Sequence, residues 1–209
     1  MHLRCPAVLV AARAHGETAI IARLLTEEHG LVAGFVAGGR GRVLRPVVIP
    51  GNSVELQLSS RSETQLPFAR LELLESRGPW LAEPLPAAAI TWACALTASA
   101  LPERQPFPPL FAALSALLTA VCHAPSARGW VAGLIAYERL LLRELGYGDR
   151  GLHDAAGPVA GLAGHDFGEN LAALDALGPS LSRNLLAARY GDVMAARSRL
   201  RELLGRIVE

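Results

Sequence analysis

Hydrophobic and polar positions follow two different patterns along the chain, and the pattern changes near residue 80. Before that point, short runs resemble strands. Residues 53–59 alternate most regularly, with Val54, Leu56 and Leu58 on one face and polar side chains on the other, which is typical of a half-buried strand. Four more runs, separated by turns rich in glycine and proline, are also predicted to be strands: 3–14, 18–26, 31–37 and 66–75.

After residue 80 the chain becomes rich in alanine and leucine at helical spacing. This spacing predicts helices over four ranges: 86–101, 109–123, 127–146 and 183–208. Residues 147–182 have little periodicity and contain many turn-forming residues. We expect an irregular connection there, with one short helix at about 170–177.

Five short strands ahead of a helical region define the expected fold. The oligonucleotide-binding (OB) barrel is the commonest small five-stranded barrel. We therefore predict an α+β chain of two domains. An OB-type β-barrel occupies residues 1–79, and an all-helical domain occupies residues 80–209, with the irregular segment at about 147–182.

Composition excludes several classes of enzyme. All 20 basic residues are arginine, so the chain has no lysine for a Schiff base or for a phosphate-binding loop. The three cysteines, Cys5, Cys94 and Cys122, are too far apart for a zinc or redox motif. We predict no catalytic residue, no metal and no cofactor. A hydrolase that uses the loop from His153 to Glu169 is kept as a rival.

Two uncharged stretches, residues 85–101 and 110–122, are shorter than the ~20 residues that a membrane-spanning helix needs. Both are bordered by prolines, as expected of buried helices in a water-soluble domain. The sequence therefore predicts a cytoplasmic protein.

The clearest candidate for a binding site lies between the third and fourth predicted strands. Residues 38–46 contain three glycines and three arginines, Arg40, Arg42 and Arg45. Guanidinium groups bind phosphate oxygens in pairs of hydrogen bonds, so we expect a mobile cationic loop that contacts nucleic-acid phosphates. Phe35 and Phe68 are the only aromatic residues of the predicted barrel, so base stacking is expected to contribute little.

A second pattern lies in the predicted helix 127–146, where three arginines project within about sixty degrees of one another. Beside an apolar position, such a stripe suits the acidic and apolar end of a peptide. A solvated helix face is the alternative. The four candidate peptide-binding positions are Arg128, Arg139, Leu142 and Arg143.

Several short stretches, in this order, resemble the RecO family of bacterial DNA repair proteins. Each is short, but their order is specific. They are Arg-Ala-His-Gly-Glu at 13–17, Leu-Thr-Glu-Glu-His-Gly at 25–30, Gly-Gly-Arg-Gly-Arg at 38–42, Pro-Gly-Asn at 50–52, Leu-Pro-Glu-Arg at 101–104, and the stretch from Tyr-Glu-Arg to Gly-Tyr-Gly at 137–148.

The resemblance implies an OB domain followed by a helical domain, and a function without catalysis. Such a protein would bind single- and double-stranded DNA, anneal complementary strands, and work with RecR to load RecA onto DNA coated by single-strand-binding protein (SSB). It would be associated with the nucleoid. On this chain, Arg13, Arg40, Arg42 and Arg45 become the candidate DNA contacts. The arginine stripe becomes a candidate dock for the C-terminal tail of SSB.

The chain departs from the family pattern after residue 148. Many relatives have a cysteine-bearing segment there, sometimes a zinc finger, whereas residues 149–182 contain no cysteine and look shortened. We therefore predict no zinc. The alternative function is a protein-interaction adaptor with little DNA affinity of its own.

Overall fold

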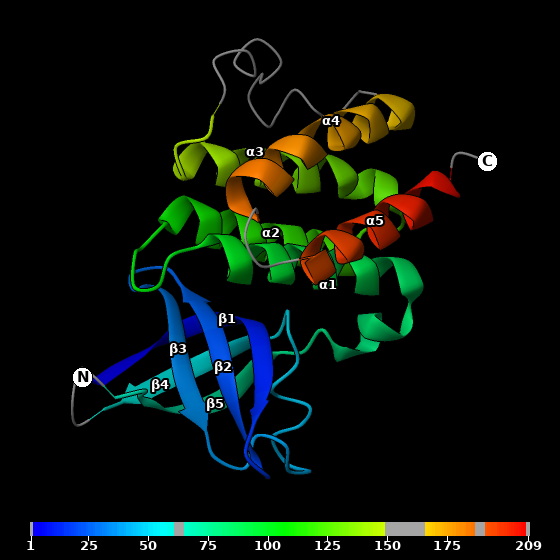
Figure 1. The fold of residues 1–209 in the computed structure, drawn as a ribbon. Coiled ribbons are helices and arrows are strands. Elements are labelled where there is room, and N and C mark those ends of the chain that lie inside the picture. Colours follow the sequence, from blue (N-terminus) through cyan, green and yellow to red (C-terminus); the bar gives the residue numbers. More distant parts are fainter. Residues whose placement is uncertain (1, 61–64, 149–165, 187–190, 208–209) are drawn as a thin grey trace. The chain divides into compact units, whose positions relative to one another are not determined.

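The computed structural model describes residues 2–60, 65–148, 166–186 and 191–207. Strands come first along the chain and helices follow (Figure 1). The strands are β1 (His2–His15), β2 (Ala19–Thr26), β3 (Gly30–Val36), β4 (Ser53–Ser59) and β5 (Phe68–Glu75). All five lie where the hydrophobic pattern predicts them, with no end shifted by more than two residues.

The five strands form a closed barrel in the order β1-β2-β3-β5-β4. The neighbouring strands are antiparallel except β3 and β5, which are parallel where Phe35 pairs with Phe68. A closed five-stranded barrel of this kind is the OB architecture. The predicted fold class, an α+β chain with an N-terminal OB-type barrel and a helical region after it, is confirmed.

Strand β1 closes the barrel because it pairs with two neighbours. Its first half, from His2 to Val8, pairs with β4, and its second half, from Ala7 to His15, pairs with β2. The register with β2 shifts between Leu9 and Ala11. A bulge of this kind bends a strand and increases its twist, which lets one long strand follow the curve of a small barrel.

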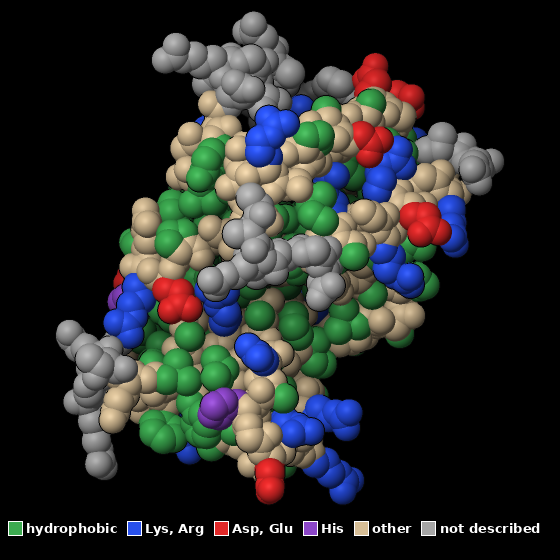
Figure 2. Space-filling model, in the orientation of Figure 1, with side chains coloured by type: hydrophobic (Ala, Val, Ile, Leu, Met, Phe, Trp, Pro, Cys, Tyr) green, Lys and Arg blue, Asp and Glu red, His purple; other side chains and the backbone are tan. Residues whose placement is uncertain are grey.

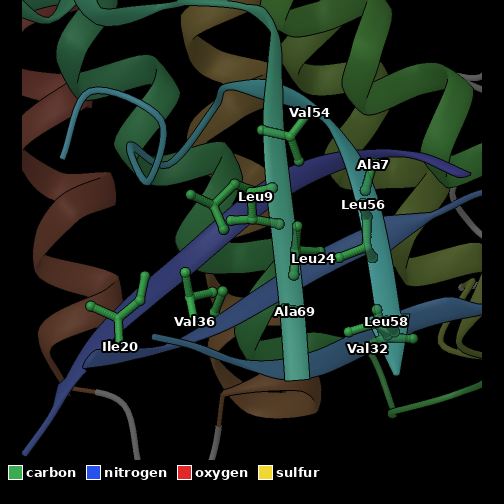
Figure 3. Close-up of a cluster of buried hydrophobic side chains, with 12 residues drawn as sticks. Ala7, Leu9, Ile20, Leu24, Val32, Val36, Val54, Leu56, Leu58 and Ala69 are labelled. Carbon is green, nitrogen blue, oxygen red and sulfur yellow. The ribbon is translucent and has the colours of Figure 1, made fainter. Parts of the chain in front are cut away.

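The barrel interior is filled by aliphatic side chains from alternate positions of each strand (Figure 3). Leu9, Leu24, Val54 and Leu56 are completely buried there. The alternation seen in residues 53–59 therefore marks the interior face, as predicted. The other interior side chains are Ala7, Ile20, Ala22, Val32, Val36, Leu58, Ala69 and Leu71.

Residues 94–111 belong to the same compact unit as the barrel, which comprises residues 1–83 and 94–111. The Arg104 backbone N–H donates to the Leu31 carbonyl at 2.8 Å. The Arg23 guanidinium donates to the Ala98 carbonyl and pairs with Glu103 at 3.3 Å. These contacts fix a segment of chain along one end of β2 and β3.

The second compact unit comprises residues 84–93 and 112–209. The helices are α1 (Pro84–Ala100), α2 (Pro108–His123), α3 (Val131–Glu144), α4 (Phe167–Leu185) and α5 (Gly191–Gly205), with short 3-10 turns at Gly78–Ala82 and Ala127–Gly129. Thus α1 and α2 each contribute residues to both units. The boundary at residues 79 and 80 stays a prediction.

Helix α4 corrects the expectation of an irregular segment up to residue 182 with a short helix at 170–177. It runs from Phe167 to Leu185 and has Pro179 in its interior. The Gly178-Pro179 pair is typical of a helix end because proline lacks an N–H and clashes with the preceding turn. Here α5 supports the helix, since Arg201 forms two hydrogen bonds with Asp175, at 2.7 and 2.8 Å. Residues 149–165 lie outside the described part of the chain.

Two predicted helices differ in extent from the observed ones. The range 127–146 contains a 3-10 turn and then α3, because Trp130 between them has φ −133° and ψ −14°, which is not helical. The range 183–208 contains the end of α4 and then α5, which begins at Gly191. Residues 187–190 between them lie outside the described residues.

A buried charged network joins four helices within the helical unit. Glu138 of α3 is completely buried and accepts two hydrogen bonds from Arg197 of α5, at 3.2 and 2.9 Å. Trp92 of α1 donates to the same carboxylate at 2.8 Å, and Arg197 also donates to the Leu174 carbonyl of α4 at 2.5 Å. Burial raises the pKa of Glu138, and the hydrogen bonds from Arg197 and Trp92 oppose that rise.

Replacing Gly30 by alanine is expected to lower the free energy of unfolding by about 2–4 kcal/mol. Gly30 has φ +66°, and a Cβ there would lie 2.0 Å from the Gln105 carbonyl oxygen. Gly16→Ala is the control, because Gly16 has φ +60° but open space around it. Urea unfolding should show a loss of only about 1–2 kcal/mol for that variant. Equal losses would contradict the close approach of residue 105.

Replacing Arg197 by methionine is expected to cost about 3–5 kcal/mol, because it leaves the Glu138 carboxylate buried without its cation. Adding Glu138→Gln should recover part of that loss, since a neutral amide still accepts from Trp92. Because the folded-state pKa of Glu138 is raised, the penalty in the single variant should grow as pH rises above about 4.3. Urea unfolding at several pH values tests this. If the stability change of the double variant equals the sum of the changes for Arg197→Met and Glu138→Gln alone, the network is contradicted.

Candidate nucleic-acid interface

A row of four side chains crosses the outside of the barrel. The strand registers pair Arg13 with Ile21, Ile21 with Phe35, and Phe35 with Phe68. The row therefore runs from β1 across β2 and β3 to β5, with neighbouring strands about 4.8 Å apart. It has a cation at one end and two aromatic rings at the other.

His15 and the two phenylalanines of this row form a continuous aromatic strip. His15 packs edge-on against Phe35, with ring centroids 5.8 Å apart, and Phe35 packs edge-on against Phe68 at 5.4 Å. Phe68 is 62% exposed. Figure 2 shows hydrophobic side chains gathered on this part of the barrel, with a histidine and basic side chains close by. The barrel thus carries an aromatic strip that the count of aromatic residues did not predict.

The arginine-bearing loop between β3 and β4 is ordered by turns, which corrects the expectation of a mobile loop. Hydrogen bonds within it join Gly41 N to Gly38 O at 2.8 Å and Arg45 N to Gly41 O at 2.9 Å. Leu44, together with two valines that follow it, packs against the barrel core. The loop therefore holds the backbone of its arginines in place before any ligand arrives, which lowers the ordering cost of binding.

Asn52 organises the base of this loop. It is completely buried, and its side-chain N–H groups donate to the carbonyls of Pro46 and Val47 at 2.9 and 3.0 Å. Its side-chain oxygen accepts from the Arg77 backbone N–H at 2.8 Å. This explains physically why a Pro-Gly-Asn stretch follows the arginines, a role that the sequence pattern did not reveal.

The loop arginines differ in what they contact. Arg40 donates to the carbonyls of Gly16 and Glu17, at 3.3 and 2.9 Å, so its guanidinium clamps the loop to the β1–β2 turn. Arg42 and Arg45 are exposed, and their side chains have no hydrogen bond or ion pair within the described residues. Arg13 is also exposed, on β1 near the same turn. The structure therefore brings the four predicted DNA contacts to one end of the barrel.

The opposite end of β2 and β3 is covered by the chain itself. Glu103 forms an isolated parallel β-bridge with Leu31, and the Arg23 guanidinium donates a hydrogen bond to the Ala98 carbonyl. The open part of this face is therefore the end that carries Phe35 and the arginine loop. Any ligand of the face is confined to that end.

The predicted peptide-binding positions on the helical unit are not brought together in the way the stripe suggested. Arg128 lies on the 3-10 turn before α3, with its guanidinium 4.9 Å from the centre of the Phe167 ring. Arg143 is well exposed and lies 3.3 Å from Glu144, whereas Arg139 is half-buried. Leu142 is only 1% exposed, so it belongs to the core and cannot contact a peptide.

No catalytic arrangement emerges from the described residues. Burial raises the pKa of the Cys94 thiol to about 12, and burial also raises that of Cys5, so neither is a ready thiolate. His153 and most of the loop proposed for a hydrolase lie outside the described residues. Within the described ranges, no group of three His, Cys, Asp or Glu side chains could hold a metal ion. No described helix is long and apolar enough to cross a membrane.

Comparison with known proteins shows similarity to the RecO family over most of the chain. Residues 1–77 match the family model "Recombination protein O N terminal", and residues 83–157 match "Recombination protein O C terminal". Curated relatives with the name "DNA repair protein RecO" also align with this chain. That of Rhodospirillum centenum is 36% identical over 92% of this chain and 90% of its own length.

Other relatives align over a shorter region. The protein of Phenylobacterium zucineum is 40% identical over 71% of this chain, and that of Caulobacter vibrioides is 41% identical over 68%. These alignments cover 60% and 58% of the relatives' own lengths, respectively, so this chain spans less than two thirds of either protein.

Replacing Arg40 by alanine is expected to lower the free energy of unfolding by about 1 kcal/mol, because two hydrogen bonds to the β1–β2 turn are lost. Arg42→Ala is the matched control and should change stability by less than about 0.5 kcal/mol, as is usual for exposed positions. Thermal unfolding of both variants tests the difference. Equal stability of the two variants would show that the Arg40 clamp contributes nothing in solution.

Proposed function

The chain belongs to the RecO family of DNA repair proteins, and from this premise we propose that it is a DNA-binding recombination mediator. The proposed binding surface is the open end of the OB barrel. It consists of the cross-strand row from Arg13 to Phe68 together with the loop arginines. The proposal rests on one observation, the exposed aromatic strip beside an ordered arginine loop on the same end of the barrel.

The two parts of this surface suit different parts of DNA. Arg42 and Arg45 project from an ordered loop and have no internal partner among the described residues, so both are available to phosphate oxygens. Such contacts work on single and double strands alike, because both have phosphates. The exposed Phe68 ring can stack only on unpaired bases, which gives single strands an additional contact.

Annealing follows from the same charges. Two complementary strands repel each other through their phosphates until counterions or protein cations neutralise them. An arginine cluster that binds one strand lowers the repulsion felt by the second strand, so pairing becomes faster without any covalent step. We therefore propose no catalytic residue, no metal and no cofactor for this function.

The protein partners are part of the proposal. We propose that RecR and the C-terminal tail of SSB bind this protein and that together they load RecA onto DNA. For the SSB tail, Arg139 and Arg143 are one helical turn apart, about 6 Å along α3. Arg128 lies outside α3, on the 3-10 turn that precedes it, so an acidic tail would need an extended conformation to reach all three. These activities would place the protein in the cytoplasm, at the nucleoid.

The double variant Arg42→Ala/Arg45→Ala is expected to bind single-stranded DNA more weakly and with a flatter salt dependence. Each phosphate contact on a single strand contributes about 0.7 to the slope of log affinity against log salt, so the slope should fall by about 1.4. Fluorescence anisotropy of a labelled strand of about 30 nucleotides, measured at several salt concentrations, gives both quantities.

The matched control is Arg183→Ala/Arg199→Ala, which removes the same charge from exposed positions on α4 and α5. An equal loss of slope in both double variants would mean that the loop is not a specific contact. If the unaltered protein does not bind DNA at low salt, the proposal fails. The protein-interaction adaptor, tested with an SSB tail peptide, then becomes the better explanation.

A further inference from the structure

A groove of about 620 Å³ lies on the barrel where β1 begins, β4 ends and β5 begins. It is outside the arginine loop, and the predicted DNA contacts do not include its residues. Its volume falls within the range of about 300–1,000 Å³ that is typical of sites for small molecules. The groove therefore has room for a nucleotide-sized group.

The strand registers define the groove as two adjacent rows of side chains. In the first row, Ser59 of β4 pairs with His2 of β1 and with Phe68 of β5. In the second row, Gln57 pairs with Arg4 and with Arg70. The groove thus offers an aromatic ring, hydrogen-bonding groups and two guanidinium groups. These are the groups that recognise a base and a phosphate.

Phe68 belongs to this groove and also to the aromatic strip on the other face. It pairs with Phe35 on one side and with Ser59 on the other. The strip and the groove are therefore one continuous path around the barrel, with Phe68 at the point where they meet. A strand stacked on Phe35 and Phe68 arrives at the groove without leaving the protein surface.

The charges of the groove favour an anion at one position. Arg4 is paired with Glu55 at 2.7 Å, so much of its charge is already balanced. Arg70 is exposed, and its side chain has no hydrogen bond or ion pair among the residues described. The next row along the strands pairs Glu55 with Glu72, and these carboxylates would repel a phosphate. Arg70 is therefore the cation that a phosphate meets on leaving Phe68, and the acidic row marks the edge of the path.

We propose that this groove binds the next one or two nucleotides of a single strand whose preceding bases stack on Phe35 and Phe68, with Arg70 contacting a phosphate. The inference rests on the proposed DNA-binding function and extends it to a second face of the barrel. A single strand is the occupant because the aromatic strip receives unpaired bases and leads directly into the groove. The path around Phe68 would also bend the strand away from the arginine loop.

The test measures the affinity of the full chain for oligothymidylates of increasing length, by anisotropy, with and without Arg70→Ala. Long strands reach the groove, so Arg70→Ala should lower their affinity roughly three- to tenfold. The slope of log affinity against log salt should fall by about 0.7 in the same variant. Short strands occupy only the strip and the loop, so their affinity should not change. The length at which affinity stops rising should be shorter in the variant.

Arg183→Ala on α4 is the matched control, since it also removes one exposed arginine. If Arg70→Ala and Arg183→Ala behave alike at every length while Arg42→Ala/Arg45→Ala weakens binding, the groove is not part of the path and the proposed function stands. If Arg70→Ala weakens short and long strands equally, Arg70 acts on the first face and the extension is wrong. If the unaltered protein binds no strand, the proposed function itself fails.

Discussion

The pairing of β1 with both β2 and β4 is the constraint on which the binding surfaces depend. Closure of the barrel fixes the register of every strand, and the register alone brings Arg13, Phe35 and Phe68 into one row. The same closure places His2 of β1 beside β4 and so forms the groove. Neither surface needs a special backbone conformation. Both follow from the alternation that sends aliphatic side chains inward and leaves these residues outside.

The fold could be predicted from the sequence wherever one periodicity prevailed. Residues 53–59 alternate without interruption, and they form β4 with the predicted ends. Helix α4 was predicted only in part, over residues 170–177 and 183–185, because Gly178 and Pro179 lie inside it and local rules end a helix there. The packing of the buried side chains Leu171, Leu174 and Leu181 maintains α4, and an exposed ion pair also joins its Asp175 to Arg201, which is 26 residues away. No local pattern carries such information.

In the candidate site, the arginines could be named from the sequence, whereas the aromatic strip could not. Arg42 and Arg45 could be named because a glycine-arginine run is visible in one stretch of sequence. Phe35 and Phe68 are visible as residues, but only the strand order β3-β5 makes them neighbours. Asn52 is visible as part of a short motif, but its role depends on hydrogen-bond partners that lie on both sides of it in the chain.

The Glu138–Arg197 pair sets an order of events during synthesis on the ribosome. The carboxylate is made 59 residues before its guanidinium, whereas the barrel unit lies entirely within the first 111 residues. A nascent chain can therefore close the barrel while the helical unit still holds an unpaired acid beside exposed leucines. Such partly built domains are the stage at which chains aggregate or recruit chaperones. The helical unit is then completed only when α5 docks, after the barrel with its proposed DNA-binding end has closed.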